Sequence, residues 1–145
     1  MKLPEYVSVG EVKRVCKKLK LRDWTALKAP SVLMKEAKIL LPVVNTDGMD
    51  IDMEEFRRGL EVELEHGFAF ANFNVTNNHP VLTAKIVMAH FMETTDYYRL
   101  LDVAELEGDV LKALVAGNIE KARSKYKKLG EAKAILGKAE SGQLP

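Results

Sequence analysis

The stretch PVLTAKIVMAHFMETTDYYRLLDVA, residues 80–104, decides the expected fold because it has the spacing of a long amphipathic helix. Pro80 suits the first turn of a helix, where its missing N–H is not needed. At about 100° per residue, one side of this helix collects Leu82, Ile86, Ala89, Tyr97, Leu100 and Ala104. We therefore expect one helix over residues 80–104, and Glu93 falls in the middle of its apolar side.

A second helix is expected immediately upstream, over residues 52–67. Asp52 and Glu55 form a capping box, in which each satisfies backbone N–H groups at the helix start. The apolar side of this helix carries Met53, Phe56, Leu60, Leu64 and Gly67. Residues 68–79 link the two helices and contain three phenylalanines, so we expect the link to pack against the domain.

Helices are also expected on both sides of this helix–link–helix unit. Ser8 and Glu11 form another capping box, and Cys16 lies in the apolar stripe that follows, which indicates a buried structural thiol. Ser31 can cap a short helix that ends at Pro42.

Toward the C-terminus, Gly108-Asp109 and Gly117-Asn118 are typical of helix breaks, and residues 140–145 read as a frayed tail. A stripe of Ile119, Ala122, Tyr126 and Leu129 predicts an amphipathic helix between the second break and the tail. The fold is therefore expected to be all-α, a single domain of five or six helices over residues 1–145, with residues 52–104 as its core.

The composition is that of a globular protein, with 47% hydrophobic and 30% charged residues. The apolar runs are too short to span a bilayer, and the N-terminus has no apolar core of a secretion signal. The single cysteine excludes an internal disulfide and a cysteine-based zinc site. We expect a cytoplasmic protein without a membrane partner.

Charge is segregated along the chain, although the net charge is only +1. Residues 11–28 carry seven Lys/Arg against two acids, residues 47–67 eight acids against two Arg, and residues 109–140 eight Lys/Arg against four acids. Opposite charges on different elements most simply attract one another within the fold. The near-neutral total argues against nucleic-acid binding, which uses a long-range positive field.

Four ionisable residues on the two central helices predict a metal site. Glu63 and His66 are three residues apart, as are His90 and Glu93, so each pair shares one side of its helix. Proteins that hold two iron or manganese ions in a helical bundle use Glu-x-x-His pairs aimed inward from facing helices. Here residues 63–66 have that order and residues 90–93 reverse it. Mixed imidazole and carboxylate ligands suit Fe, Mn or Zn. Reserve ligands are Glu65, His79 and Asp96.

Glu93 motivates this hypothesis, because a carboxylate on an apolar helix side must find a partner, take up a proton or bind a cation. The positions of the two residue pairs along their helices argue against the hypothesis. The first pair lies close to the link and the second nearly three turns beyond it, a mismatch of roughly 13 Å. The link can span about 40 Å and therefore permits the required slide.

Three other interpretations stay open at this point. The glutamates and histidines can form a buried structural network, in which Glu93 pairs with Arg57, Arg58, Lys85 or His90. The chain can be an interaction or assembly module, binding a protein partner or a second copy through its basic C-terminal helix or the phenylalanines of the link. The third interpretation is acid–base catalysis without a metal. The sequence alone does not establish that the chain is an enzyme.

Residues 56–101 resemble an uncharacterised family, known as a domain of unknown function. The shared text includes Glu-x-Glu-His-Gly at residues 63–67, Asn-Val-Thr-Asn at 74–77, Ala-His-x-x-Glu at 89–93 and Asp-Tyr-Tyr at 96–98. Family members often carry Asp before Pro80 and Leu-Asn before Glu93, where this chain has His79 and Phe91-Met92. The resemblance implies that the helix–link–helix unit is the functional or structural core, and it implies no reaction.

Overall fold

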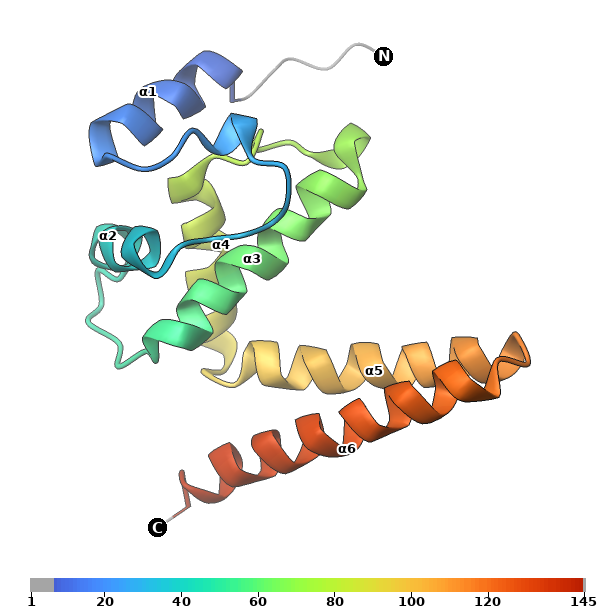
Figure 1. The fold of residues 1–145 in the computed structure, drawn as a ribbon. Helices are drawn as coiled ribbons and strands as arrows, with labels where there is room; N and C mark the ends of the chain where they lie inside the picture. The colour runs from blue at the N-terminus through green and yellow to red at the C-terminus, as the bar shows by residue number, and fades with distance from the viewer. Residues whose placement is uncertain (1–6, 145) are drawn as a thin grey trace. The chain divides into compact units, whose positions relative to one another are not determined.

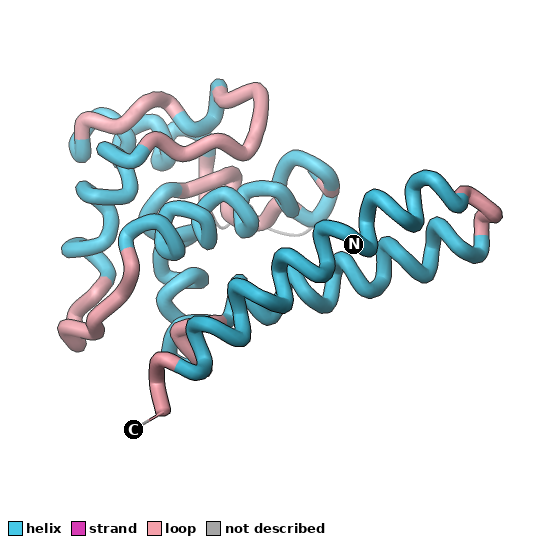
Figure 2. Tube along the Cα trace, turned by 60° about the horizontal axis from the view of Figure 1, so that its bottom comes forward, coloured by secondary structure: helices cyan, strands magenta, loops and turns pink. Residues whose placement is uncertain are grey.

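The computed structural model describes residues 7–144 of the chain. These residues form six α-helices with short connections and no β-strand, which confirms the all-α fold (Figures 1 and 2). No helix in the described part is both long and apolar enough to cross a bilayer. The expected single domain separates by its internal contacts into an N-terminal unit (Met1–Met92) and a C-terminal unit (Glu93–Pro145), and each is described by itself.

The first helix, α1 (Val9–Leu19), begins at the predicted cap, where the Oγ of Ser8 accepts the N–H of Glu11 at 3.2 Å. The carboxylate of Glu11 pairs with Arg14 at 2.6 Å. Cys16 is buried, as expected, and this burial raises the pKa of its thiol. A 3-10 turn (Trp24–Ala26) follows and places the indole of Trp24 in the core.

Helix α2 (Met34–Val44) packs against α3 (Met53–Ala69). The cap of α2 is Leu33 rather than Ser31, and Pro42 lies within its last turn rather than at its end. A proline so close to the end of a helix removes only a late backbone bond, so the helix continues for two residues. Helix α3 begins after Asp52, as predicted, and buries Phe56, Gly59, Leu60 and Leu64.

The expected helix over residues 80–104 is wrong, because the chain forms two helices there: α4 (Pro80–Glu93) and α5 (Tyr97–Val115). The hydroxyl of Thr94 accepts the backbone N–H of Asp96 at 3.2 Å, and the carbonyl of Thr94 accepts the N–H of Tyr97 at 3.2 Å. Threonine side chains compete with helical hydrogen bonds in this way. The apolar stripe that placed Glu93 at its centre therefore joined residues of two different helices.

The buried side of α4 differs from the predicted one. It consists of Pro80, Thr83, Ala84, Val87, Met88 and Phe91, which recur at helical spacing. Ile86 and Ala89, from the predicted side, are exposed. Because most residues of α4 are apolar, the sequence pattern gives little information about which side of the helix faces the core. The predicted side was therefore the wrong one.

The C-terminal unit is a hairpin of α5 and α6 (Ile119–Ser141), which run side by side in opposite directions (Figures 1 and 2). Gly117 has a φ of 68° and makes the predicted turn, whereas Gly108-Asp109 lies inside α5 and breaks nothing. Two ion pairs join the helices: Asp109 with Lys125 at 2.6 Å and Glu107 with Lys133 at 2.7 Å. A frayed tail was expected over residues 140–145, but the first two of these residues belong to α6, which ends at Ser141. Pro145 lies outside the described residues.

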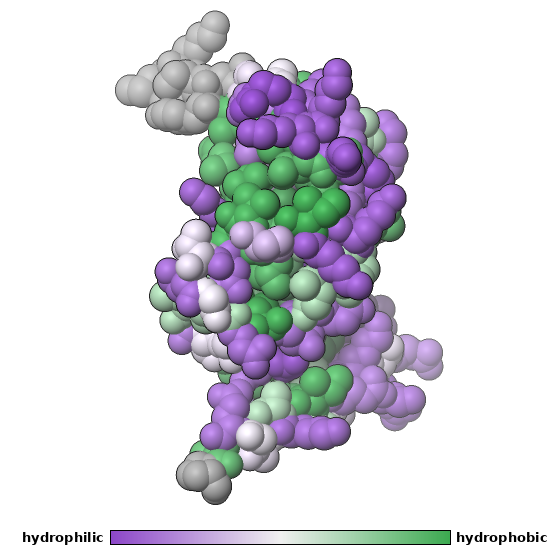
Figure 3. Space-filling view, turned by 90° about the vertical axis from the view of Figure 1, so that its left-hand side faces the viewer, coloured by the Kyte–Doolittle hydropathy of each residue, from purple (hydrophilic) through white to green (hydrophobic). Residues whose placement is uncertain are grey.

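The surface is mixed in character. Figure 3 shows hydrophobic residues reaching the surface among hydrophilic ones on the face that it presents. In the link, Phe70 and Phe73 are exposed, so the expectation that its phenylalanines pack against the domain is wrong for these two.

Candidate functional site

Glu63 of α3 is the point where three of the four predicted ligands meet. Its Oε1 lies 3.5 Å from Nε2 of His90 on α4, and its Oε2 lies 3.8 Å from Nδ1 of His66 on α3. The Glu63 side chain is only 11% exposed, His90 is 26% exposed and His66 is 68% exposed. A nearly buried carboxylate therefore has one imidazole beside it at the protein interior and another at the surface.

The placement follows from where each residue lies on its own helix. Glu63 lies one residue before the buried Leu64 and one turn after the buried Gly59, so it occupies the edge of the buried side of α3. His90 is next to Phe91, the last buried residue of α4. Glu63 and His90 therefore come into contact despite the axial mismatch expected from the sequence.

The link is held beside this site by asparagines. The Nδ2 of Asn74 donates to Oδ1 of Asn78 at 2.9 Å, and both side chains press against Gly67. A Cβ at position 67 would lie 2.3 Å from the Asn78 oxygen and 2.7 Å from the Asn74 nitrogen. Asn77 and Asn78 have φ values of 49° and 59°, a left-handed conformation that asparagine tolerates better than most residues. The Glu-x-Glu-His-Gly and Asn-Val-Thr-Asn segments thus form one packed structure.

A cavity of about 120 Å³ opens between these segments and α4. Its lining includes Glu63, His66, Asn74, Thr76, Thr83 and Ile86. Carboxylate, imidazole, amide and hydroxyl groups therefore share one small space with apolar walls, which suits a bound ion with water or a small polar molecule.

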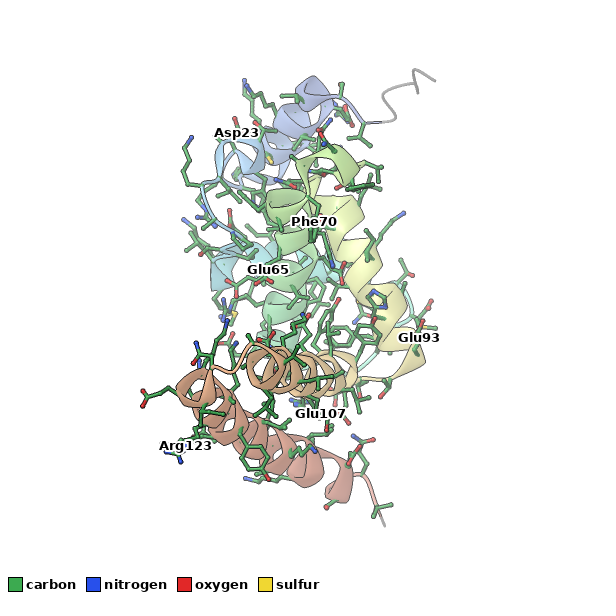
Figure 4. The ribbon with its side chains drawn as sticks, turned by 90° about the vertical axis from the view of Figure 1, so that its right-hand side faces the viewer. Asp23, Glu65, Phe70, Glu93, Glu107 and Arg123 are labelled. Carbon is green, nitrogen blue, oxygen red and sulfur yellow. The ribbon has the colours of Figure 1, made fainter. Side chains whose placement is uncertain are left out.

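Glu93 does not belong to this site. It is exposed at the end of α4, and Figure 4 shows its side chain there. The inference that Glu93 is forced out of water is therefore wrong. The apolar stripe on which it was based joined residues of α4 and α5, which the break at Thr94 separates. Of the partners suggested for Glu93, Arg57 pairs instead with Glu54 and Glu61, both at 2.7 Å.

The reserve ligands are placed elsewhere. Glu65 is exposed on α3. Asp96 is buried and accepts hydrogen bonds from Arg99 at 2.6 Å and from Gln143. His79 is buried at the start of α4, where its Nδ1 accepts the N–H of Leu82 at 3.2 Å. Burial holds the pKa of the His79 imidazole below its ordinary value. Within residues 7–144, no three His, Cys, Asp or Glu side chains are already arranged to hold a metal ion.

With this geometry in view, comparison with known families gives one result. Residues 12–107, about two-thirds of the chain, match the family described as "Protein of unknown function (DUF5661)". The chain belongs to the DUF5661 family. Neither a curated protein nor a solved structure was found to match it.

The DUF5661 match confirms the resemblance and extends well beyond the residues that carried it. It includes every residue of the Glu63 site, the helices α2, α3 and α4, and the first half of α5. Helix α6 lies beyond its end.

Within the DUF5661 region, the most deeply buried carboxylate of the described residues is that of Glu36 on α2, which the sequence interpretation missed. Glu36 is 1% exposed and pairs with Arg22 at 2.6 Å. It also accepts the N–H groups of Arg22 and Leu33, both at 3.0 Å, and the indole N–H of Trp24 at 3.3 Å. Burial opposes ionisation of this carboxyl, but the hydrogen bonds from Arg22, the backbone and Trp24 outweigh it, so its pKa is lowered. One sequence signal was available: Glu36 lies in the first turn of α2, where a carboxylate binds the N–H groups of the helix start.

Proposed function

We propose that the chain binds a divalent transition-metal ion between α3 and α4, with Glu63, His66 and His90 as its protein ligands. Glu93, the fourth predicted ligand, is left out because it is exposed. The observation that carries the proposal is the pair of distances from the Glu63 carboxylate to two imidazole nitrogens, 3.5 and 3.8 Å.

These distances fit donors around an ion better than they fit hydrogen bonds. A charge-assisted N–H···O bond joins atoms about 2.7–2.9 Å apart. Two donors that each lie about 2.1 Å from one tetrahedral zinc ion are roughly 3.4 Å apart. The spacing between Glu63 and each histidine is close to the second value.

His66 completes the site by turning its side chain. Its ring is 68% exposed, so rotation about its side-chain bonds disturbs little packing. Glu63 and His90 lie deeper, at 11% and 26% exposed, and supply the fixed part of the site. Water in the adjoining cavity of about 120 Å³ supplies the remaining ligands.

The donor set indicates which ions bind best. Two imidazoles and one carboxylate suit Zn²⁺, Fe²⁺ and Mn²⁺. Affinity for a site of this kind rises from Mn²⁺ through Fe²⁺ and is greater again for Zn²⁺. A site with three protein ligands and water positions open to exchange is also the arrangement of catalytic rather than structural zinc.

The test measures binding of Zn²⁺ and Mn²⁺ to the purified chain by isothermal titration calorimetry. We expect one ion per chain, and we expect Glu63→Gln or His90→Gln to weaken Zn²⁺ binding by about 100-fold or more, since each removes a direct ligand. Glu65→Gln and Glu93→Gln are matched controls, because each removes an exposed carboxylate from the same helices. Both should bind Zn²⁺ as the parent chain does.

Two results would remove the proposal. One is an absence of saturable Zn²⁺ binding by the correctly folded parent chain. The other is equal weakening by Glu93→Gln and by Glu63→Gln, which would indicate nonspecific binding to surface carboxylates. Either result would leave the Glu63 cluster as a purely structural network.

A further inference from the structure

The hairpin of α5 and α6 leaves a continuous apolar surface uncovered. Its largest exposed members are Leu111, Leu114 and Val115 of α5 and Ile119 and Tyr126 of α6, a set that we call the hairpin face. Between the helices lies an open groove of about 320 Å³, lined chiefly by Val110, Leu114, Ile119, Ala122 and Tyr126. Val115 is 82% exposed, and Tyr126, which the sequence analysis placed in an amphipathic stripe, is 68% exposed. Exposed apolar patches of this kind mark interaction surfaces.

The hairpin face extends along both helices at helical spacing. On α5 it continues through Leu111, Ala104 and Leu100, all of which are exposed. On α6, Ile119 and Tyr126 lie seven residues apart, as do Gly130 and Gly137, so the apolar side chains and the two glycines fall on one side of the helix. Apolar residues at this spacing form the seam between packed helices in bundles and coiled coils.

Gly130 and Gly137 lie on the α6 side of the hairpin face, and no contact within the described residues of one chain requires a glycine at either position. A Cβ on Gly130 or Gly137 would meet no atom within 4 Å in the described structure, and neither residue has a positive φ. Glycine in the interior of an exposed helix lowers its stability relative to alanine. Small residues at these positions allow the helix of another molecule to approach closely.

We propose that a second copy of this chain covers the hairpin face, so that two hairpins form an antiparallel four-helix bundle. Two helices alone bury few large apolar side chains, and in α6 the buried residues are only Ala122, Leu129 and Leu136. Face-to-face pairing of two hairpins gives each helix a second neighbour, as in dimeric four-helix bundles. Helix α5 has 19 residues and is about 28 Å long. A face of that length and two helices wide has the scale of a stable dimer interface.

The charges of the two helices favour this orientation of the two copies, in addition to the ion pairs Asp109–Lys125 and Glu107–Lys133 that already join α5 and α6 within one chain. Helix α5 carries four acids and two bases, a net charge of −2, whereas α6 carries three acids and seven bases, a net charge of +4. A two-fold axis along the hairpin places α5 of each copy over α6 of the other, so helices of opposite charge meet. Figure 4 labels one residue of each sign, Glu107 on α5 and Arg123 on α6.

The experiment is sedimentation velocity on the full chain from about 1 to about 500 µM, the range in which dimers of moderate affinity dissociate. We expect a concentration-dependent monomer–dimer equilibrium. Leu114→Glu and Tyr126→Glu should each raise the dissociation constant at least about 10-fold, because both place a charge in the centre of the interface. Ile135→Glu is the matched control, since Ile135 is also exposed on α6 but lies outside the groove, and it should leave the equilibrium unchanged.

Gly130→Gln keeps the proposal testable if the charged variants fold poorly. Within one chain the new side chain has room and favours the helix, so thermal stability at low concentration should be unchanged or higher. In the dimer it obstructs the close approach, and the dissociation constant should again rise at least about 10-fold. A parent chain that stays monomeric to about 500 µM overturns the proposal, and so does a dimer that Leu114→Glu, Tyr126→Glu and Gly130→Gln leave intact.

Discussion

Glu63 on α3 and His90 on α4 face each other with Oε1 and Nε2 3.5 Å apart, although 27 positions separate them along the chain. The distance is too long for a strong ionic hydrogen bond and suits two donors around a common ion. His66 approaches the other oxygen of the same carboxylate, so both oxygens of Glu63 have an imidazole nearby.

Metal binding at Glu63 should raise thermal stability. An ion that binds only the folded chain stabilises it by about 2.7 kcal/mol at a concentration of 100 times its dissociation constant. For a domain of this size that corresponds to a rise in melting temperature of several degrees. Differential scanning fluorimetry with Zn²⁺ should show the rise in the parent chain and in Glu93→Gln. In Glu63→Gln it should be lost, and an undiminished rise there would place the ion elsewhere.

Glu36→Ala should destabilise the N-terminal unit by about 2–4 kcal/mol, because it leaves Arg22 and three N–H groups without the buried oxygen atoms that accept them. Urea unfolding followed by Trp24 fluorescence measures this loss. Glu65→Ala, which removes an exposed carboxylate, should change the midpoint little. Equal midpoints for the two variants would show that the Arg22–Glu36 pair contributes no stability.

The lowered pKa of Glu36 fixes the direction of its pH dependence. Its folded-state pKa is below the ordinary 4.5, so the stability that it contributes is present above about pH 4.5 and is lost as the pH falls further. Urea midpoints measured between neutral pH and pH 3 should therefore converge for the parent chain and Glu36→Gln. Midpoints that stay equally separated down to pH 3 would contradict this.

His79 should make the chain less stable in mild acid. Burial lowers its pKa below the ordinary 6.5, so the unfolded chain takes up a proton first. The stability associated with the neutral imidazole is full above about pH 6.5 and falls as the pH is lowered through the folded-state pKa. His79→Asn retains an acceptor for the start of α4 and cannot titrate. Its melting temperature should vary less between pH 7 and pH 5 than that of the parent chain, and an identical slope would exclude His79 as the cause.

Gly67→Ala should destabilise the chain by about 1 kcal/mol, although alanine normally favours a helix. The added Cβ would displace the Asn74 and Asn78 side chains and break their mutual hydrogen bond. Asn78→Gly removes one of the displaced groups at a position with positive φ, so the same alanine substitution should cost less in that background. Denaturant unfolding of the four chains gives the coupling, and a coupling of zero would mean that the asparagines do not explain Gly67.

The two capping boxes and the apolar stripe of α3 were sufficient to place α1 and α3 from the sequence, because caps and periodicity are local signals. The helix break after Glu93 was missed, because the hydroxyl and the carbonyl of Thr94 accept backbone N–H groups in a turn that the apolar spacing does not show. That error also moved Glu93 into the predicted site. Glu63 does lie near His66 and near His90, as helical spacing and the length of the link allowed, and the role of these residues as metal ligands stays a prediction. Glu36 was missed because its burial depends on Arg22 and Trp24, which only the tertiary fold brings to it.

The chain has three histidines, His66, His79 and His90, and this makes one measurement decisive. NMR spectra of the imidazole groups, recorded during titration of the full chain with Zn²⁺, report on each of them separately. The account predicts that the signals of His66 and His90 shift together and saturate at one ion per chain, while those of His79 stay in place. Titration to several ions per chain without movement of His66 and His90, or with equal movement of all three, would contradict a metal site at Glu63.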